Sequence, residues 1–276
     1  MDDKSIKLLR CERGIVVQQN AHYFLLQDRD WDYFINDNHL YQKIVNALPS
    51  AKAISNPGKI YHPVSAQELW ACGVTYLRSK QGRQEESQDG GDIYARVYDA
   101  KRPEVFFKAT AQRIAHPGDE VRIRKDSGWD VPEPELTLLV SSSGKILGYT
   151  VGNDMSSRSI EGENPLYLPQ AKTYDGCAAV GPCIWVTEAP IPANTLISIQ
   201  IYREDKVIFE GKIEIAQMKR SLDELVSYVY RECSFPHGAF IMTGTGIVPD
   251  HDFSLKSGDR IRIDIEGIGT LENPVA

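Results

Sequence analysis

The sequence predicts a β-rich α+β protein, in which a small N-terminal domain precedes a larger domain built mainly from strands. After Glu120 the chain consists of short apolar runs separated by Gly, Pro, Asp and Ser, interrupted by one amphipathic helix candidate. The turn-rich segment Ser55-Asn56-Pro57-Gly58-Lys59 comes well before this β-rich part. We therefore predict a small N-terminal domain at residues 1–60 and a main domain at residues 61–276.

Length and composition exclude several classes of protein. The 276 residues, 42% of them hydrophobic, are sufficient for one large domain with a small appendage. The formal charge is −7 and the basic residues are dispersed, so we expect no nucleic-acid partner. The charged start and the lack of any run of about 18 apolar residues predict no membrane partner and a cytoplasmic location. The five cysteines form no Cys-x-x-Cys pair, which predicts reduced, mostly buried thiols.

The first part of the chain mixes apolar runs with polar stretches. The runs Gly14–Val17 and Tyr23–Leu26 lie near a helix-compatible stretch at Tyr41–Leu48. From Arg78 to Asp92 the chain is almost wholly polar, and we expect either a mobile loop that could serve as a lid or an exposed charged helix.

The main domain contains the clearest strand and helix patterns. A capping box at Ser221 and Glu224 predicts a helix over Ser221–Cys233. Short apolar runs predict strands at Val121–Ile123, Leu136–Val140, Ile146–Val151, Leu196–Tyr202, Lys206–Phe209 and Ile261–Ile265.

Three acidic residues should meet at the end of a hairpin. The run from Glu133 to Val140 and the run from Ile146 to Asp154 are separated by Ser-Ser-Ser-Gly-Lys, which predicts two antiparallel strands with a tight turn. Glu133 and Glu135 then point to the same face, about 7 Å apart at their Cα atoms. If Val140 faces Ile146, Glu133 lies opposite Asn153, within one residue of register, and Asp154 arrives beside it.

Such a cluster predicts a divalent cation. Three neighbouring carboxylates repel one another unless a cation compensates them, and Mg²⁺, Mn²⁺ or Ca²⁺ suits all-oxygen ligands. The alternative is an exposed hairpin whose acids only solvate one edge. Pro132 and Pro134 flank the pair and stiffen its backbone, which favours the metal site.

Several motifs in the same order resemble the fumarylacetoacetate hydrolase superfamily over about residues 70–270. They are Pro103–Ala109, the Val-Pro-Glu-Pro-Glu-Leu run, Gly152–Arg158, the Lys172 segment and Thr243-Gly244-Thr245-Gly246. Within this superfamily, Cys72–Ser79 and Glu163–Lys172 are most similar to the 2-keto-3-deoxy-D-arabinonate dehydratases and their relatives.

The resemblance implies a fold, a cofactor and an assembly. It implies a mixed β-sheet roll, a Mg²⁺ held by Glu133, Glu135 and Asp154, and a homodimer or homotetramer. The C–C hydrolases of this superfamily carry a water-activating histidine after the tyrosine that matches Tyr76, where this chain has Leu77-Arg78-Ser79. The expected activity is therefore metal-dependent dehydration of a 2-keto-3-deoxy sugar acid to 2,5-dioxopentanoate. The alternatives are a C–C hydrolase of an acylpyruvate or 2,4-diketo acid, and a non-catalytic keto-acid-binding protein.

Two residues are the expected catalysts. Glu104 is the candidate base, with an ordinary strand-start carboxylate as the alternative. Lys172 matches the family lysine and would offset negative charge at the keto oxygen, although pattern alone indicates a surface lysine. Candidates for substrate binding are Arg78, Ser79, Lys108 and Thr245.

Other polar residues have secondary or structural interpretations. Arg78 could be solvated, Lys108 could pair with a structural acid, and the glycines beside Thr245 could only serve a turn. Arg158 is expected to be a buried partner of Asp154. By resemblance, Glu161 falls near the same site. His116 and His251 are expected at the surface.

Overall fold

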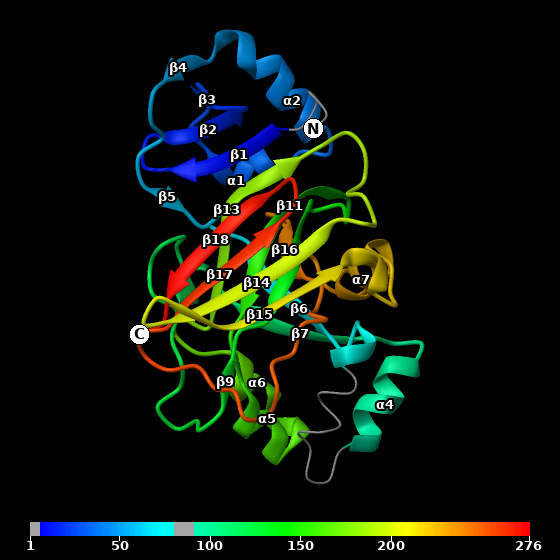
Figure 1. The fold of residues 1–276 in the computed structure, drawn as a ribbon. Helices are drawn as coiled ribbons and strands as arrows, with labels where there is room; N and C mark the ends of the chain where they lie inside the picture. The colour runs from blue at the N-terminus through cyan, green and yellow to red at the C-terminus, as the bar shows by residue number, and fades with distance from the viewer. Residues whose placement is uncertain (1–5, 80–90) are drawn as a thin grey trace.

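A computed structural model describes residues 6–79 and 91–276, and its largest element is a twelve-stranded sheet (Figure 1). A four-stranded sheet and a two-stranded sheet complete the β-structure. The large sheet contains β1 (Ile6–Cys11), β2 (Gly14–Gln19), β3 (His22–Leu25), β4 (Lys52–Ile54), β5 (Ile60–Tyr61), β6 (Glu68–Gly73), β7 (Glu104–Ala109), β8 (Ile114–Ala115), β10 (Pro134–Val140), β11 (Ile146–Asp154), β13 (Ala178–Val186) and β16 (Ala239–Met242). The smaller sheets contain β14 (Leu196–Arg203), β15 (Lys206–Glu214), β17 (Arg260–Ile265) and β18 (Gly269–Pro274), and β9 (Asp130–Val131) with β12 (Ser156–Ser157).

The large sheet is mixed, as the sequence predicted. Its main path runs β4-β3-β2-β1-β13-β11-β10-β16-β6-β7. The β16–β6 and β13–β8 pairs are parallel, and the other pairs in this sheet are antiparallel. The β-rich fold with few helices is therefore confirmed.

Alternation along β10 divides its side chains between two apolar clusters. Leu136 and Leu138 pack in one cluster with isoleucines of β14 and β17, including Ile199 and Ile263. Leu139 packs in the other cluster. Because β10 lies inside the protein, side chains on both of its faces are buried, and any carboxylate it carries is buried as well.

The helices are short, and most of them gather at the two ends of the molecule. They are α1 (Trp31–Ile35), α2 (Leu40–Ala47), α4 (Gly91–Asp99), α5 (Arg158–Glu163), α6 (Leu168–Lys172) and α7 (Leu222–Val229), with 3-10 turns at Leu48–Ser50, Ala111–Arg113, Pro165–Tyr167 and Ile215–Gln217. Figure 1 shows α4, α5 and α6 gathered at the end opposite the N-terminal strands, whereas α7 lies beside the sheets midway between the two ends. The helices thus lie in the segments that connect the strands. Within the described residues, no helix is long and apolar enough to span a bilayer.

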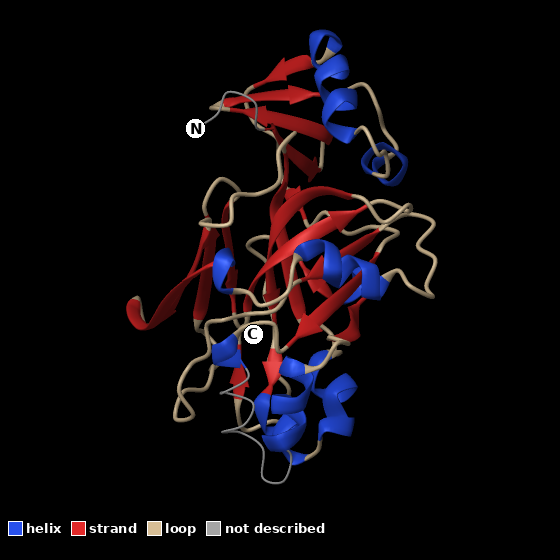
Figure 2. Ribbon diagram, turned by 90° about the vertical axis from the view of Figure 1, so that its right-hand side faces the viewer, coloured by secondary structure: helices blue, strands red, loops and turns tan. Residues whose placement is uncertain are grey.

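The N-terminal strands continue the large sheet. β1 pairs with β2 on one side and with β13 on the other, through Ile6 opposite Val186 and Leu8 opposite Ile184. Side chains of α1 and α2, such as Phe34 and Ile44, are buried in the cluster that also holds Ile184. Figure 2 shows these strands and helices together at one end of the molecule. The domain division at residue 60 stays a prediction.

The predicted elements of the N-terminal part are close to the observed ones. The apolar runs at 14–17 and 23–26 overlap β2 and β3, and α2 begins one residue before the predicted helix. Of the polar segment at 78–92, residues 80–90 lie outside the described residues, and α4 begins at Gly91.

Two predicted elements of the main domain differ from the structure. The predicted helix from Ser221 ends at Val229, because Arg231 to Cys233 are exposed and add no apolar burial to sustain it. Its cap is as predicted, since the Ser221 hydroxyl accepts from the backbone N–H of Glu224 at 3.2 Å.

The predicted strand at Val121–Ile123 was wrong. Val121 makes only an isolated bridge with Val275, after which the Arg122 N–H donates to the Gly176 carbonyl at 3.0 Å. The chain therefore leaves its partner after one bridge. The remaining predicted strands lie within β10, β11, β14, β15 and β17.

We expect Gly238→Ala to destabilise the protein by about 1–3 kcal/mol. Gly238 has a φ of +75°, and an added Cβ would lie 2.4 Å from the Val140 carbonyl oxygen, beside the β10–β16 pairing. Gly128→Ala is the control, because a Cβ there would meet no heavy atom within 4 Å. Urea denaturation measures both variants, and equal stability of the two would contradict the expectation.

Candidate metal centre and active site

The β10–β11 hairpin brings the acidic residues together through backbone pairing. Val140 lies opposite Ile146 as predicted, but the register shifts between Val140 and Leu139, which lies opposite Gly148. Because of this bulge, Pro134 lies opposite Asn153, and Glu133 pairs directly with Asp154. The Glu133 N–H donates to the Asp154 carbonyl at 3.2 Å, and the Asp154 N–H donates back at 2.9 Å. The observed partner of Glu133 is therefore one residue beyond Asn153, within the one-residue margin of the predicted register.

The side chains of Glu133, Glu135 and Asp154 converge inside the protein. One carboxylate oxygen from each lies within 4.8 Å of those of the other two. The three residues are 5%, 1% and 1% exposed, which excludes the alternative of an exposed acidic edge. Three oxygen donors in one buried site are the ligand set that Mg²⁺ prefers, so the residues fit this ion.

Glu135 is a buried carboxylate whose ionised form a cation would stabilise. Burial raises its pKa well above the usual value of 4.5, and the neighbouring Asp154 and Glu133 carboxylates raise it further. Its Oε2 accepts from the backbone N–H of Gly244 at 2.5 Å. A divalent ion at this site would therefore favour the ionised form of Glu135.

Lys172 lies in the centre of the acidic cluster. It is 1% exposed at the end of α6, and its Nζ lies 2.8 Å from Glu133 Oε2 and 3.0 Å from Asp154 Oδ2. The ammonium also donates to Ser156 Oγ at 2.5 Å. The pattern-based expectation of a surface lysine was wrong, because partners distant in sequence bury this side chain.

Arg158 is buried, but its carboxylate partner differs from the predicted one. Its Nη2 lies 2.5 Å from Glu133 Oε1, and its Nη1 lies 3.8 Å from Glu161 Oε2. The expected pairing with Asp154 was therefore wrong. Glu161, at 1% exposure, does lie near the site, because one turn of α5 carries both Arg158 and Glu161.

A small cavity adjoins these charged groups. Its walls include two of the three carboxylates, Lys172, and loop residues from the ends of β6 and β16. The lining residues are Cys72, Gly73, Val74, Ser79, Phe106, Glu133, Asp154, Arg158, Lys172, Gly244 and Thr245.

Glu104 reaches the cavity wall at Gly73. Gly73 and Glu104 are paired across β6 and β7. A Cβ atom added at position 73 would lie only 1.9 Å from Glu104 Oε2. Only glycine at position 73 leaves space for this carboxylate. The geometry is compatible with the expected base, although its role stays a prediction.

The four substrate-binding candidates have different surroundings. Ser79 and Thr245 line the cavity, but the Ser79 hydroxyl donates to the Tyr76 carbonyl at 2.7 Å and that of Thr245 accepts from the Ile247 N–H at 3.1 Å. Arg78 is not among the lining residues, and its Nη2 lies 3.9 Å from Asp250. Lys108 is fully buried against Asp154, which matches the alternative of a structural ion pair.

Sequence reasoning missed several contributors to the site. Gly244 was interpreted only as a turn residue, yet its φ of +91° turns its N–H toward Glu135. Ser156 and Gly73 carried no signal beyond their places in the family motifs. His116 is partly exposed at the surface, as predicted, and its ring stacks on His62 with centroids 4.4 Å apart. His251 is exposed as predicted.

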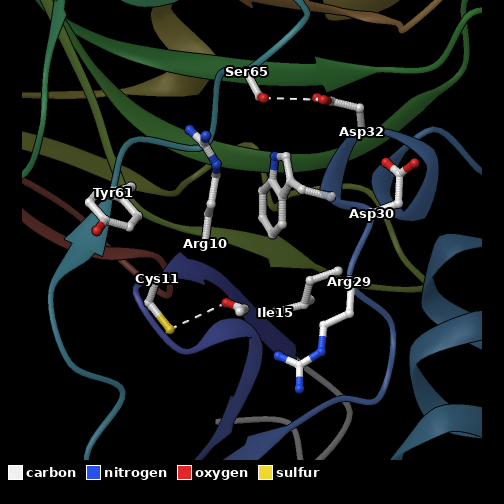
Figure 3. A pocket seen from close by; sticks show the side chains of 10 residues that line it. Arg10, Cys11, Ile15, Arg29, Asp30, Asp32, Tyr61 and Ser65 are labelled. Atoms are coloured by element: carbon white, nitrogen blue, oxygen red, sulfur yellow. Dashed lines mark hydrogen bonds between the residues drawn. The ribbon is translucent and has the colours of Figure 1, made fainter.

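A larger cavity of about 610 Å³ lies in the N-terminal part, away from the carboxylates (Figure 3). Its polar groups serve local structure: Ser65 donates to Asp32 at 3.1 Å, and Arg10 donates to the Val64 carbonyl at 3.1 Å. None of the predicted site residues lines it. We therefore assign the chemistry to the smaller cavity.

Comparisons with known proteins show the family and the fold that this chain shares. The family model for the C-terminal part of fumarylacetoacetate (FAA) hydrolase matches residues 78–276. A probable 2-keto-3-deoxyxylonate dehydratase of Haloferax volcanii is 55% identical over 214 residues, which cover 77% of this chain and 73% of that protein. The 2-dehydro-3-deoxy-D-arabinonate dehydratase of Saccharolobus solfataricus is 44% identical over 224 residues, which cover 80% and 75%.

Solved structures are similar over nearly the whole chain. A 2-keto-3-deoxy-D-arabinonate dehydratase complexed with magnesium and 2,5-dioxopentanoate has a TM-score of 0.83 and 35% identity, with 98% of each chain covered. A fumarylacetoacetate hydrolase of Exiguobacterium antarcticum, 21% identical with a TM-score of 0.74, shares the fold.

The electrostatics of Glu135 predict a pH dependence of stability in metal-free protein. Its folded-state pKa is raised, so its contribution to stability is present below about pH 4.5 and is lost as the pH rises through the folded-state pKa. Glu135→Gln removes the ionisable group and with it this loss. We therefore expect the free energy of unfolding of the variant, relative to that of the wild type, to increase as the pH rises. Urea denaturation in EDTA at several pH values measures this difference, and a pH-independent difference would contradict it.

Proposed function

The chain belongs to the fumarylacetoacetate hydrolase family, and we propose that it is a magnesium-dependent dehydratase of 2-keto-3-deoxy sugar acids. The observation that carries this proposal is the buried cluster of Glu133, Glu135 and Asp154 beside a cavity lined by Lys172. The relatives that share about half of their residues with this chain are named as dehydratases of such acids.

The names of the two relatives indicate one substrate type. Arabinonate and xylonate that have the same configuration at C4 differ only in their configurations at C2 and C3. Once C2 is a ketone and C3 a methylene group, both give the same 2-keto-3-deoxypentonate. The proposed reaction removes one water from this compound and yields 2,5-dioxopentanoate, the compound in the magnesium-containing neighbour.

Glu133, Glu135 and Asp154 would hold the Mg²⁺. When bound there, the ion would supply Lewis acidity to the carboxylate and keto oxygens of a 2-keto acid. Glu133 and Asp154 line the cavity, as does Gly244, whose N–H donates to the carboxylate of Glu135. The protein's own groups therefore fix the direction from which the keto-acid end of the substrate is bound.

Glu104 and Lys172 would move protons and stabilise charge. The Glu104 carboxylate, above Gly73, would accept a proton from C3 of the substrate. Lys172, at the cavity wall, would offset the negative charge that develops on the C2 keto oxygen. The electron pair left at C3 forms the C3=C4 double bond as hydroxide leaves C4 and is protonated to water. Proton transfers that isomerise this enone convert C5 to the aldehyde of the product.

Ser79 and Thr245 would border the remainder of the substrate. Both line the cavity, and their hydroxyls are already oriented by backbone groups of their own turns. Arg78 lies outside the lining, so a direct contact between Arg78 and the substrate would require its side chain to leave Asp250. Assembly into a homodimer or homotetramer and a cytoplasmic location stay predictions.

A side-by-side assay tests the proposal against its alternatives. Purified protein with Mg²⁺ is incubated with 2-keto-3-deoxy-D-pentonate and, separately, with an acylpyruvate, and products are identified by NMR. We expect 2,5-dioxopentanoate from the first and no pyruvate from the second. Pyruvate without dioxopentanoate would indicate a C–C hydrolase. Calorimetric binding of both metal and keto acid without any turnover would indicate a non-catalytic protein.

The place of Glu104 gives a more specific prediction. In Gly73→Ala the new methyl group would occupy the position of the Glu104 carboxylate, so we expect dehydration to slow by about 100-fold or more. Magnesium affinity should stay within about twofold of the wild type, because the atoms nearest to the added Cβ all belong to Glu104 and not to a proposed ligand. Glu104→Gln is the comparison variant and should give a similar loss. Full activity of Gly73→Ala would exclude Glu104 as the base.

A further inference from the structure

Lys108 is a buried ammonium with three close acceptors. It is 0% exposed on β7, and its Nζ lies 2.5 Å from Asp154 Oδ1. The same Nζ donates to the Met155 carbonyl at 2.9 Å and to the Lys172 carbonyl at shorter range. Lys108 thus donates two hydrogen bonds to backbone carbonyls and forms an ion pair with the Asp154 carboxylate.

These contacts exclude a direct role for Lys108 in substrate binding. Lys108 does not line the cavity, is 0% exposed, and has its ammonium enclosed by the Asp154 carboxylate and two backbone carbonyls. Lys108 shares a strand face with Glu104 and Phe106, but it lies deeper in the protein than either of them. Its function must therefore be exerted through the groups that it contacts.

The three acceptors belong to the parts of the chain that form the site. Asp154 ends β11, Met155 follows it, and Lys172 ends α6. Lys108 binds Oδ1 of Asp154 while the Lys172 ammonium binds Oδ2 at 3.0 Å. One buried side chain thus fixes both the orientation of the Asp154 carboxylate and the backbone that carries Lys172.

We propose that Lys108 is a positioning residue that holds Asp154 and Lys172 in the geometry required for the divalent ion. The inference rests on the proposed metal site. Groups that orient a metal ligand typically contribute 10–100-fold to metal affinity. The carboxylate of Asp154 would otherwise be free to rotate, and the end of α6 would lose its attachment to β7.

A competing electrostatic effect predicts the opposite change in magnesium affinity. Lys108 and the divalent ion are both positive, so Coulomb repulsion alone predicts that removal of the ammonium tightens metal binding. Positioning predicts that its removal weakens metal binding. The direction of the change in affinity therefore distinguishes the two effects.

The test is the magnesium affinity of Lys108→Met, measured by isothermal titration calorimetry on metal-free protein with MgCl₂. Methionine keeps the apolar stem and removes the ammonium. We expect affinity to fall by about tenfold or more. The control is Lys59→Met, which removes an exposed lysine paired with Asp119 and should bind as the wild type does. The melting temperature of each metal-free variant is recorded alongside.

Each outcome supports or overturns the proposal. Unchanged or tighter magnesium binding by Lys108→Met overturns it, even if the melting temperature falls, because Lys108 would then be merely structural. If the wild type itself binds no magnesium, both the metal site and this inference fail. If Lys108→Met does not fold, Lys108→Arg decides: the planar guanidinium keeps the charge but cannot reach the same three acceptors. Weaker binding by this variant supports positioning, and wild-type affinity overturns it.

Discussion

The buried carboxylates at the end of the β10–β11 hairpin impose the constraint that the rest of the site satisfies. Glu133 and Asp154 each contact cationic side chains within 3.0 Å, whereas Glu135 receives the backbone N–H of Gly244. Burial of charge costs several kcal/mol per ion unless it is paired and hydrogen-bonded. The cations supplied by β7, α5 and α6 are therefore as necessary to the fold as to the chemistry. A divalent ion would add to the stabilisation that Lys172 and the Gly244 N–H give the ionised Glu135 carboxylate.

The fold serves this constraint by bringing distant segments to one point. The bulge between Leu139 and Val140 sets the register that pairs Glu133 with Asp154, and the parallel pairing of β16 with β6 brings the Gly244 turn beside Gly73. The N-terminal strands extend the same sheet but carry no residue of the site. Their larger cavity is lined by groups that hold local structure together, which explains why cavity size alone does not locate the chemistry here.

Much of the fold and of the candidate site could be predicted from the sequence. The features that could not be predicted have physical explanations. Strand alternation placed Glu133 and Glu135 on one face, and the turn residues located the hairpin. The bulge was not predicted because no residue type in the two strands indicates it. It shifted the register of the hairpin by one residue. Lys172 and Lys108 could be understood only from contacts with β11, which is distant in sequence. Family motifs supplied Lys172 and Glu104, whereas Ser156 and the Gly244 N–H required the structure.

The central claim is that one oxygen each from Glu133, Glu135 and Asp154 binds a single Mg²⁺. A crystal structure of the protein grown with MgCl₂ and pyruvate tests it most directly. The account predicts one ion at about 2.0–2.1 Å from an oxygen of each residue, with the keto acid completing its octahedron. Crystals at saturating magnesium with no ion among these carboxylates, or with the ion bound elsewhere, would contradict it.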